Sequence, residues 1–364
     1  MMNTTRRPRG LKLAILMLSL CGFWHISQAD PLPLRIVSTP NPNVFPLLLA
    51  MSNQPQLPVT LLPVGTAGEA STALINGSAD GLLSMTYTAA QMVTTGKVPD
   101  LALVSVDFWN GFSVLAPQNA QITSFTDLIN HGVLIAGPTS GGKGSGPDLI
   151  FQAAARRAGL DASSFALCYL PVMQAVPLLL SQAPMNSNPA CNPADSSAAT
   201  AISLVEPAAT GLVLQSRSGD NATGLVRKVI PLQPLFSGYT AWPSDELPHG
   251  GLSIRGSVLN AADSQQTSRR VLLAYEQAAA QIMAAKPHPL QLMRIAQTIS
   301  AGITAYYGQY GLSIPAPVIF AALESGDFRY RTDRPLAAIE PDLNRFLAEV
   351  VGSPIPDSFF HPLP

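Results

Sequence analysis

A glycine-rich segment at 137–146 carries the groups best suited to binding a small ligand. The apolar run 133–136 before it predicts a buried strand, and Pro147 opens an apolar period that predicts a helix over 147–158. Backbone N–H groups at a helix start can hold a sulfonate, carboxylate or phosphate without a metal ion. The candidate ligand contacts in this turn are Thr139, Ser140 and Gly141.

The same turn fits part of a nucleotide-binding P-loop. Gly137, Gly142 and Lys143 match the spacing G-x-x-x-x-G-K. Gly144 stands where that motif needs Ser or Thr to hold magnesium, and no apolar strand ending in Asp offers a second magnesium ligand. The sequence therefore disfavours nucleotide hydrolysis, while a turn that binds nothing remains the alternative to an anion site.

No residue pattern in this sequence indicates a metal site or a catalytic centre. The five histidines are scattered and none has a partner at i, i+4, so a histidine-based metal site is not expected. No Ser/His/Asp, Cys/His or paired-carboxylate arrangement stands out. We therefore expect a protein that is not an enzyme and that uses no metal and no cofactor.

The first 29 residues have the pattern of a secretory signal peptide. Basic residues precede an apolar run at 13–24, and small residues before Asp30 predict cleavage after Ala29. The apolar run is too short for a membrane span. Leu20 stands before Cys21 where a lipoprotein signal needs a small residue, so we expect a soluble periplasmic product. The arginine pair at 6–7 leaves both Sec and twin-arginine export open.

Cleavage would leave 335 of the 364 residues, with 17 Lys and Arg against 22 Asp and Glu, a net charge of −5. This acidic balance and the absence of a basic stripe argue against nucleic-acid binding. The length suits two lobes with ordinary hydrophobic cores. Cys168 and Cys191 are the only cysteines left, and in an oxidising compartment such a pair predicts a disulfide.

Short apolar runs alternate with helical periods along the first part of the mature chain. Apolar runs of this length, alternating with helices, are typical of a parallel sheet covered on both faces. The expected strands are 34–38, 59–64, 79–84, 101–106 and 112–116, and the expected helices are 45–51, 70–76 and a segment ending near residue 96.

The strand and helix pattern continues beyond residue 117. A strand at 199–205 leads into a helical segment from 208, and the Pro-, Asn- and Ser-rich segment 182–198 predicts a surface excursion tethered by Cys191. A returning strand at 251–258 precedes helices at 267–286, 289–302 and 335–351. The expected division is a signal peptide at 1–29, a first lobe at 30–117, a second lobe at 118–248 and a return to the first lobe at 249–364.

Five segments carry a resemblance to a known family: 45–51, 79–86, 137–146, 204–208 and 252–259, the last followed by the long helix. In their order they resemble the periplasmic substrate-binding proteins of ABC importers, in the type II group that serves sulfonates, taurine, nitrate and thiamine precursors. The resemblance covers about the whole mature chain. The segment 182–198, its cysteine pair and the missing lipid-attachment signal depart from the family pattern.

The resemblance implies an α/β fold of two lobes, each a mostly parallel sheet flanked by helices, with a ligand clamped by loops at the carboxyl ends of the strands. Open α/β sheets bind ligands at that edge for physical reasons. The implied partners are a small-molecule ligand and a membrane permease, with the protein itself a monomer. The candidate ligand-binding residues of the first lobe are Asn41, Asn43, Thr66, Ser84, Thr86, Tyr87, Asp107 and Trp109. Those of the second lobe are Thr139, Ser140, Gly141, Glu206, Tyr239 and Trp242.

Several of these residues also have purely structural interpretations. Asn41 and Asn43 can shape a proline-rich turn, Asp107 can cap a helix, and Trp109 can fill the space at a hinge. A binding role and a structural role therefore both remain open for each of them.

Charge narrows the ligand class only in part. A helix start with two hydroxyls suits an anion, whereas Glu206 and Asp107 suit an amine, so a zwitterion such as an aminosulfonate satisfies both. The alternative is an aromatic cation such as a thiamine precursor, held over Trp109, Tyr87 or Trp242. An enzyme of related fold and a binding protein that feeds a sensor are the alternatives to transport.

Overall fold

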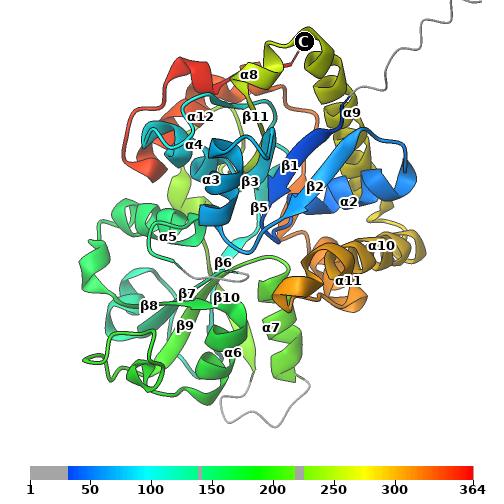
Figure 1. Cartoon of the computed structure of the whole chain (residues 1–364). Helices are drawn as coiled ribbons and strands as arrows, with labels where there is room; N and C mark the ends of the chain where they lie inside the picture. The colour runs from blue at the N-terminus through cyan, green and yellow to red at the C-terminus, as the bar shows by residue number, and fades with distance from the viewer. Residues whose placement is uncertain (1–31, 138–141, 218–224, 364) are drawn as a thin grey trace, which may run out of the picture. The chain divides into compact units, whose positions relative to one another are not determined.

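Two mixed β-sheets organise the chain (Figure 1). The computed structural model describes residues 32–137, 142–217 and 225–363. The seven-stranded sheet defines the first lobe. Its strand order is β12 (Phe328–Tyr330), β5 (Phe108–Asn110), β11 (Pro248–Arg255), β3 (Gly81–Met85), β1 (Leu34–Ser38) and β2 (Val59–Pro63), and β4 (Leu101–Leu103) also pairs with β11.

A five-stranded sheet defines the second lobe. Its strand order is β10 (Val226–Pro231), β6 (Phe112–Pro117), β9 (Ala199–Val205), β7 (Gly132–Gly137) and β8 (Ala166–Pro171). The strands β7, β8 and β9 are parallel, β6 pairs with β9 in the antiparallel direction, and β10 pairs antiparallel with β6. In the first lobe β1, β2 and β3 are parallel in the same arrangement, and β11 enters beside β3 in the antiparallel direction.

The expected two-lobed α/β fold is confirmed, but the two sheets are mixed rather than mostly parallel. Five of the six parallel strands, β1, β2, β3, β7 and β9, overlap apolar runs that the sequence predicts as strands, whereas β8, which is only partly buried, was not predicted. The antiparallel strands reach each sheet from a distant part of the chain, and the local pattern of such a strand does not reveal its direction.

The chain passes between the sheets at Asn110–Phe112, because β5 belongs to the first sheet and β6 to the second. We expected this passage at 117–118. Asn110 and Gly111 both have positive φ values, 66° and 95°, and this sharp local turn separates two otherwise continuous extended segments. The Asn110 side chain donates to the carbonyl of Asp245 (3.0 Å) and accepts the N–H of Leu247 (2.7 Å). One asparagine thereby ties the outgoing passage to the segment that returns to β11.

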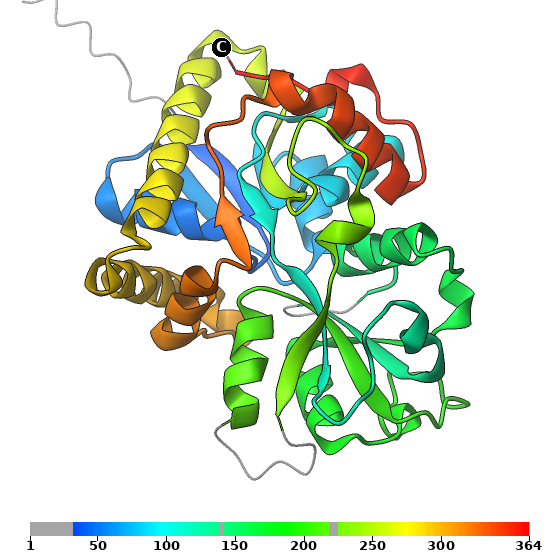
Figure 2. The ribbon, with the colours of Figure 1, turned by 180° about the vertical axis from the view of Figure 1, so that it is seen from behind.

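Helices cover both sheets (Figures 1 and 2). In the first lobe they are α2 (Val44–Asn53), α3 (Ala67–Ile75), α4 (Thr86–Thr94), α8 (Gly256–Leu259), α9 (Ala262–Ala285), α10 (Pro289–Tyr307), α11 (Ala316–Ser325) and α12 (Leu336–Val351). In the second lobe they are α5 (Gly146–Arg157), α6 (Val172–Ser181) and α7 (Ala208–Arg217). Short 3₁₀ turns are η1 (Thr126–Asn130), η2 (Ala162–Ser164), η3 (Met185–Ser187), η4 (Gln233–Phe236), η5 (Gly308–Tyr310) and η6 (Asp357–Phe359).

Local sequence signals explain where the helices near the cleft begin and end. Helix α5 begins at Gly146 with a proline in its first turn, and Gly159 beyond its end has a φ of +75°, as expected. Helix α3 begins with a capping box, in which the Thr66 hydroxyl accepts the N–H of Glu69 (3.1 Å) and the Glu69 carboxylate accepts N–H groups in return. These signals fix the helix starts that face the space between the sheets.

The segment 182–198 forms the predicted surface excursion, and a disulfide joins Cys191 to Cys168 in β8 with a Cα–Cα distance of 5.1 Å. The ends of the excursion pair with each other, for example through the N–H of Met185 and the carbonyl of Ser197 (2.8 Å). Its asparagine and aspartate side chains accept N–H groups two residues onward, which explains its composition. In the three described stretches we find no helix with the length and apolar character needed to cross a membrane.

Candidate ligand-binding site

A small cavity lies where the carboxyl ends of the parallel strands of both sheets come together. Its volume is about 80 Å³, enough for a few water molecules or the polar end of a ligand. The described residues that line it are Thr39, Asn41, Gly65, Ala67, Ala70, Leu82, Ser84, Met85, Thr88, Met92, Phe112, Gly137, Ser145, Gly146, Pro147 and Val205.

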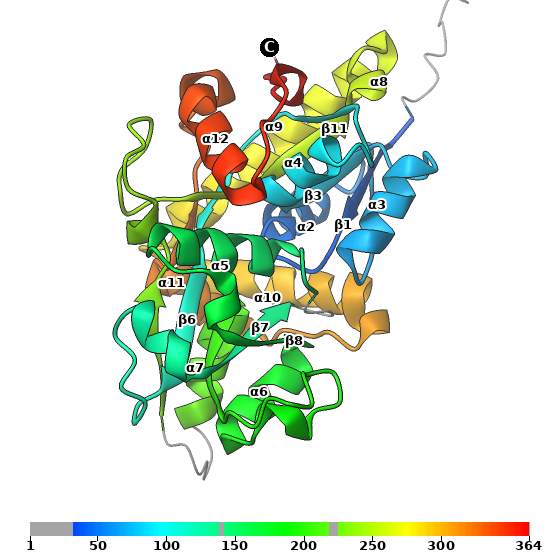
Figure 3. The ribbon, with the colours of Figure 1, turned by 90° about the vertical axis from the view of Figure 1, so that its left-hand side faces the viewer.

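The starts of α4 and α5, one from each lobe, both contribute residues to the lining of this cavity. Figure 3 shows the two helices on the same side of the molecule. Gly146 allows the approach: a Cβ atom at this position would lie 2.9 Å from the hydroxyl of Thr88 and 3.3 Å from the ring of Tyr87. A larger residue at this position would force the side chain of Thr88 to move. The two lobes therefore contact each other through helix starts, with their backbone N–H groups close to the cavity.

Among the described lining residues none has a charged side chain. Two nearby carboxylates are already engaged, because Glu69 caps α3, and Asp148 accepts the N–H of Gly144 (2.6 Å) and the hydroxyl of Tyr169 (3.0 Å). Helix α4 has no acidic residue in its first turn and no side-chain cap. The positive end of the α4 dipole therefore has no acidic side chain from its own first turn to compensate it.

Five polar side chains are in the described lining: Thr39, Asn41, Ser84, Thr88 and Ser145. The Ser145 hydroxyl is buried and has no hydrogen-bond partner among the described residues, although Ser145 is the N-cap residue of α5. Ser84 donates to the carbonyl of Met85 (3.1 Å) and keeps its acceptor capacity. The side-chain amide of Asn41 is engaged within its own turn. Its N–H group donates to the carbonyl of Thr39 (2.9 Å), and its oxygen accepts the N–H of Asn43 (2.9 Å).

The cavity contains two of the residues that we expected from the sequence, Asn41 and Ser84. The expected contacts Thr139, Ser140 and Gly141 lie outside the described residues. Thr39, Thr88 and Ser145 were not predicted. A usable signal for Ser145 was its place two residues before Pro147, where an N-cap belongs. Thr88 lies two residues beyond the predicted Thr86, on another face of the helix.

Three expected residues lie beneath the cavity floor. Thr86 donates its hydroxyl to the carbonyl of Pro248 (3.0 Å), and the hydroxyl of Tyr87 lies 3.4 Å from Nδ1 of His249. Asn43 is fully buried against Gly250, and its amide has no hydrogen-bond partner among the described residues. Burial lowers the pKa of His249 to about 3, so this histidine is neutral. None of these side chains reaches the cavity.

Asp107 is also buried behind the strand ends and does not line the cavity. Burial raises the pKa of the Asp107 carboxyl to about 8. The hydroxyl of Ser105 donates to this carboxyl (2.8 Å) and lowers the pKa, but its effect is smaller than that of burial. The side chain is therefore neutral near pH 7. This removes one of the two carboxylates that suggested an amine-binding site.

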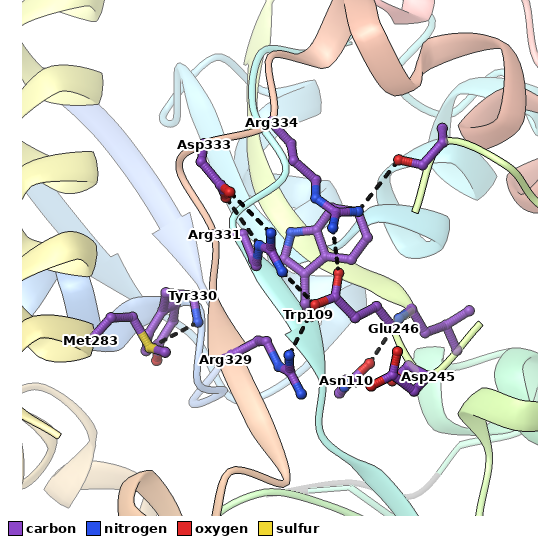
Figure 4. Close-up of polar contacts among 12 residues, drawn as sticks. Trp109, Asn110, Asp245, Glu246, Met283, Arg329, Tyr330, Arg331, Asp333 and Arg334 are labelled. Atoms are coloured by element: carbon purple, nitrogen blue, oxygen red, sulfur yellow. Dashed lines mark hydrogen bonds and ion pairs between the residues drawn. The ribbon is translucent and has the colours of Figure 1, made fainter. Parts of the chain in front are cut away.

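Trp109, Trp242 and Tyr239 form an aromatic cluster. The rings of Trp109 and Trp242 meet edge to face with centroids 5.8 Å apart, and Tyr239 stacks on Trp242 at 5.1 Å. The guanidinium of Arg334 covers Trp109 at 5.1 Å and pairs with the buried carboxylate of Glu246 (2.9 Å), as Figure 4 shows. These rings are already packed, so the expected aromatic faces for a cationic ligand are not available at the cavity.

Thr66 and Glu206 have defined structural partners. The Thr66 hydroxyl belongs to the capping box of α3, and only its neighbours Gly65 and Ala67 line the cavity. Glu206 is 1% exposed, accepts the N–H of Thr210 (3.1 Å) and forms an ion pair with Lys228. Burial opposes the charge of Lys228, but Glu206 together with Asp327 outweighs it and raises the pKa of Lys228. Glu206 lines a second, larger cavity instead.

The described residues contain no group of three or more His, Cys, Asp or Glu side chains that could share a metal ion. Comparison with known proteins adds information on the fold. No protein-family model matches the sequence, and no curated protein matches it.

Solved structures of binding proteins match most of the chain. The periplasmic aliphatic sulphonate binding protein SsuA of Escherichia coli has a TM-score of 0.60 at 18% identity, over 89% of this chain and 86% of that one. The ligand-binding component of an ABC-type import system from Staphylococcus aureus, with zinc bound, has a TM-score of 0.59 at 12% identity, over 91% and 97%. The alkanesulfonate-binding protein SsuA of Xanthomonas axonopodis, bound to MOPS, has a TM-score of 0.57 at 15% identity, over 91% and 96%.

Identities this low establish a shared architecture and leave the ligand open. The strand order of the two sheets, the cavity between their strand ends and these matches agree with one another. The chain therefore has the two-lobed α/β fold of the periplasmic substrate-binding proteins of ABC importers.

Proposed function

We propose that the exported protein binds a small anionic or zwitterionic ligand between its two lobes and delivers it, unchanged, to the permease of an ABC importer. The observation that carries this proposal is the small cavity itself: α4 and α5 start there, from opposite lobes, and its described lining offers hydroxyls but no charged side chain. Backbone N–H groups and hydroxyls at helix starts are the groups that hold anions without a counter-charge.

The proposed contacts of the first lobe are Asn41, Ser84 and Thr88. Those of the second lobe are Ser145 and, outside the described residues, Thr139, Ser140 and Gly141. A ligand that touches both lobes stabilises their closed arrangement only by its differential affinity for that arrangement. Contacts from both lobes should therefore matter together.

Of the two proposed ligand classes, a simple anion is favoured over a zwitterion. Asp107 is neutral and buried, and Glu206 is paired with Lys228, so neither carboxylate supplies a free partner for an ammonium group in the small cavity. An aromatic cation has less support, since Trp109, Tyr87 and Trp242 lie outside the lining. Two of the matching proteins are named for binding sulphonate and alkanesulfonate, and these compounds therefore come first in the screen.

The experiment is a thermal-shift screen of alkanesulfonates, taurine, nitrate, thiamine precursors and amino acids, followed by calorimetry on each hit. We expect stabilisation by an anion and no chemical change in the recovered compound. A hit restricted to cations, or conversion of a hit to product, would contradict the proposal. Export with cleavage after Ala29 belongs to the same proposal, and the intact mass of the periplasmic protein tests it.

A further inference from the structure

A second cavity adjoins the small one and is much larger, about 580 Å³ against about 80 Å³. Asn41 and Val205 line both, so the two cavities meet at these residues. The walls of the larger cavity come from the loop before α2 and from α10 and α11 in the first lobe, and from α6 and α7 in the second. Protein interiors leave few voids larger than a water molecule, whereas ligand sites of this volume are common.

The larger cavity is apolar and its walls are poor in hydrogen-bond donors. Five prolines contribute to the lining, and a proline has no backbone N–H and a fixed φ, so these parts of the wall are rigid and cannot donate. Aliphatic side chains such as Leu212 and Val318 supply much of the remaining surface. The lining prolines are Pro40, Pro42, Pro177, Pro207 and Pro315.

The larger cavity has one charged side chain in its described lining, and that charge is paired. Glu206 is the only ionisable side chain among its described lining residues, and it is paired with Lys228, which also bridges to Asp327 of the first lobe. An occupant of this cavity therefore meets apolar walls and no unpaired charge. Burying a second charged group there would cost free energy without a partner to offset it.

We infer that the natural ligand is an amphiphilic anion: its charged end occupies the small cavity at the starts of α4 and α5, and an apolar tail extends past Asn41 and Val205 into the larger one. This inference rests on the proposed function and narrows its ligand class. It excludes nitrate- and taurine-sized compounds as the preferred ligand, because they leave the larger cavity unfilled.

Calorimetry with a homologous series from ethanesulfonate to decanesulfonate, and with the matching alkanoates, tests the inference. Each added methylene should increase the affinity about fourfold until the cavity is filled. Binding of ethanesulfonate with no gain along either series would overturn the inference and leave the proposed function intact. Failure of every member of both series would contradict the anion site itself.

A pair of matched variants locates the tail. Val318 in α11 lines the larger cavity and is only half-buried, whereas Leu290 in α10 is 80% exposed and lies outside it. In Val318→Asp, the gain from ethanesulfonate to decanesulfonate should fall at least tenfold relative to wild type, while Leu290→Asp should retain it. An equal gain in both variants, with the native far-ultraviolet circular dichroism spectrum retained, would place the tail elsewhere.

Discussion

The polar residues near the strand ends fall into two sets with different surroundings. The cavity set lines the small cavity and consists of Thr39, Asn41, Ser84, Thr88 and Ser145. The buried set lies behind it and consists of Asn43, Thr86, Asp107 and His249. Asn41 and Asn43 belong to one turn, yet the first faces the cavity and the second packs against Gly250. The local contacts of a polar side chain therefore decide whether it lines the cavity or packs behind it. Its residue type and its place at a strand end do not decide this.

This comparison predicts that the buried set controls stability, and Asp107→Asn should show the largest effect. The folded protein keeps Asp107 protonated up to about pH 8, whereas the unfolded chain ionises it near its ordinary pKa of 3.8. The contribution of the Asp107 carboxyl to the free energy of unfolding is therefore fully present below about pH 4 and is lost as the pH rises toward 8. Asp107→Asn should remove this loss, which amounts to several times ~1.4 kcal/mol, since each pKa unit contributes about that much.

Urea unfolding of both proteins at several pH values between 4 and 8 measures the effect. The difference in free energy of unfolding between Asp107→Asn and wild type should grow steadily with pH. A difference that stays constant across this range would mean that Asp107 is ionised in the folded protein. Ligand affinity of the variant should remain within about twofold of wild type, well below the loss expected for a hydrogen bond to a charged group.

The disulfide extends the comparison to a region that lies outside both cavity linings. Cys168 and Cys191 close a loop with a sequence separation of 23 residues, and breaking the bond should lower the free energy of unfolding by about 3 kcal/mol. Because neither cysteine lines a cavity, reduction should lower the melting temperature without a comparable change in ligand affinity. Free thiols found by alkylation of the freshly isolated protein would contradict the bond.

Thr66 gives the smallest expected effect and tests the boundary of the cavity set. Its hydroxyl caps α3 and lies beside the lining without being part of it. Thr66→Ala should lower the free energy of unfolding by about 1 kcal/mol, the usual loss for an N-cap. Thr66→Ser retains the cap and serves as the control. A tenfold loss of affinity in Thr66→Ala at unchanged stability would move Thr66 into the cavity set.

Sequence reasoning predicted the elements whose signals are local. The strands β1 and β9 match their expected ranges, and the start and end of α5 follow from proline and glycine at its two ends. Short or antiparallel strands such as β5, β10 and β12 were not predicted, because they are stabilised by pairing with distant strands rather than by a periodic run. The helices α6 and α11 were also not predicted.

The same distinction holds for the candidate site. The general location, loops at the carboxyl ends of strands, followed from the expected fold, and Asn41 and Ser84 line the cavity there. Which neighbouring residues turn away could not be predicted, because this depends on contacts such as that of Asn43 with Gly250, more than 200 residues apart in sequence. Arg334, which covers Trp109, is likewise distant in sequence, and Lys228, which pairs with Glu206, lies 22 residues further along the chain.

The most direct test of the central claim is ligand affinity in matched pairs of variants from both lobes, measured by calorimetry on the best compound from the screen. Thr88→Val and Ser145→Ala remove hydroxyls of the cavity set, and Thr86→Val and Ser203→Ala make the same changes at buried positions outside the lining. We predict that each cavity variant loses roughly ten- to a hundredfold in affinity, about 1.5 to 3 kcal/mol per hydrogen bond to a charged group, while each buried control stays within about twofold of wild type. Losses confined to one lobe, or equal losses in the cavity variants and their controls, would contradict a ligand held between the two lobes at this cavity.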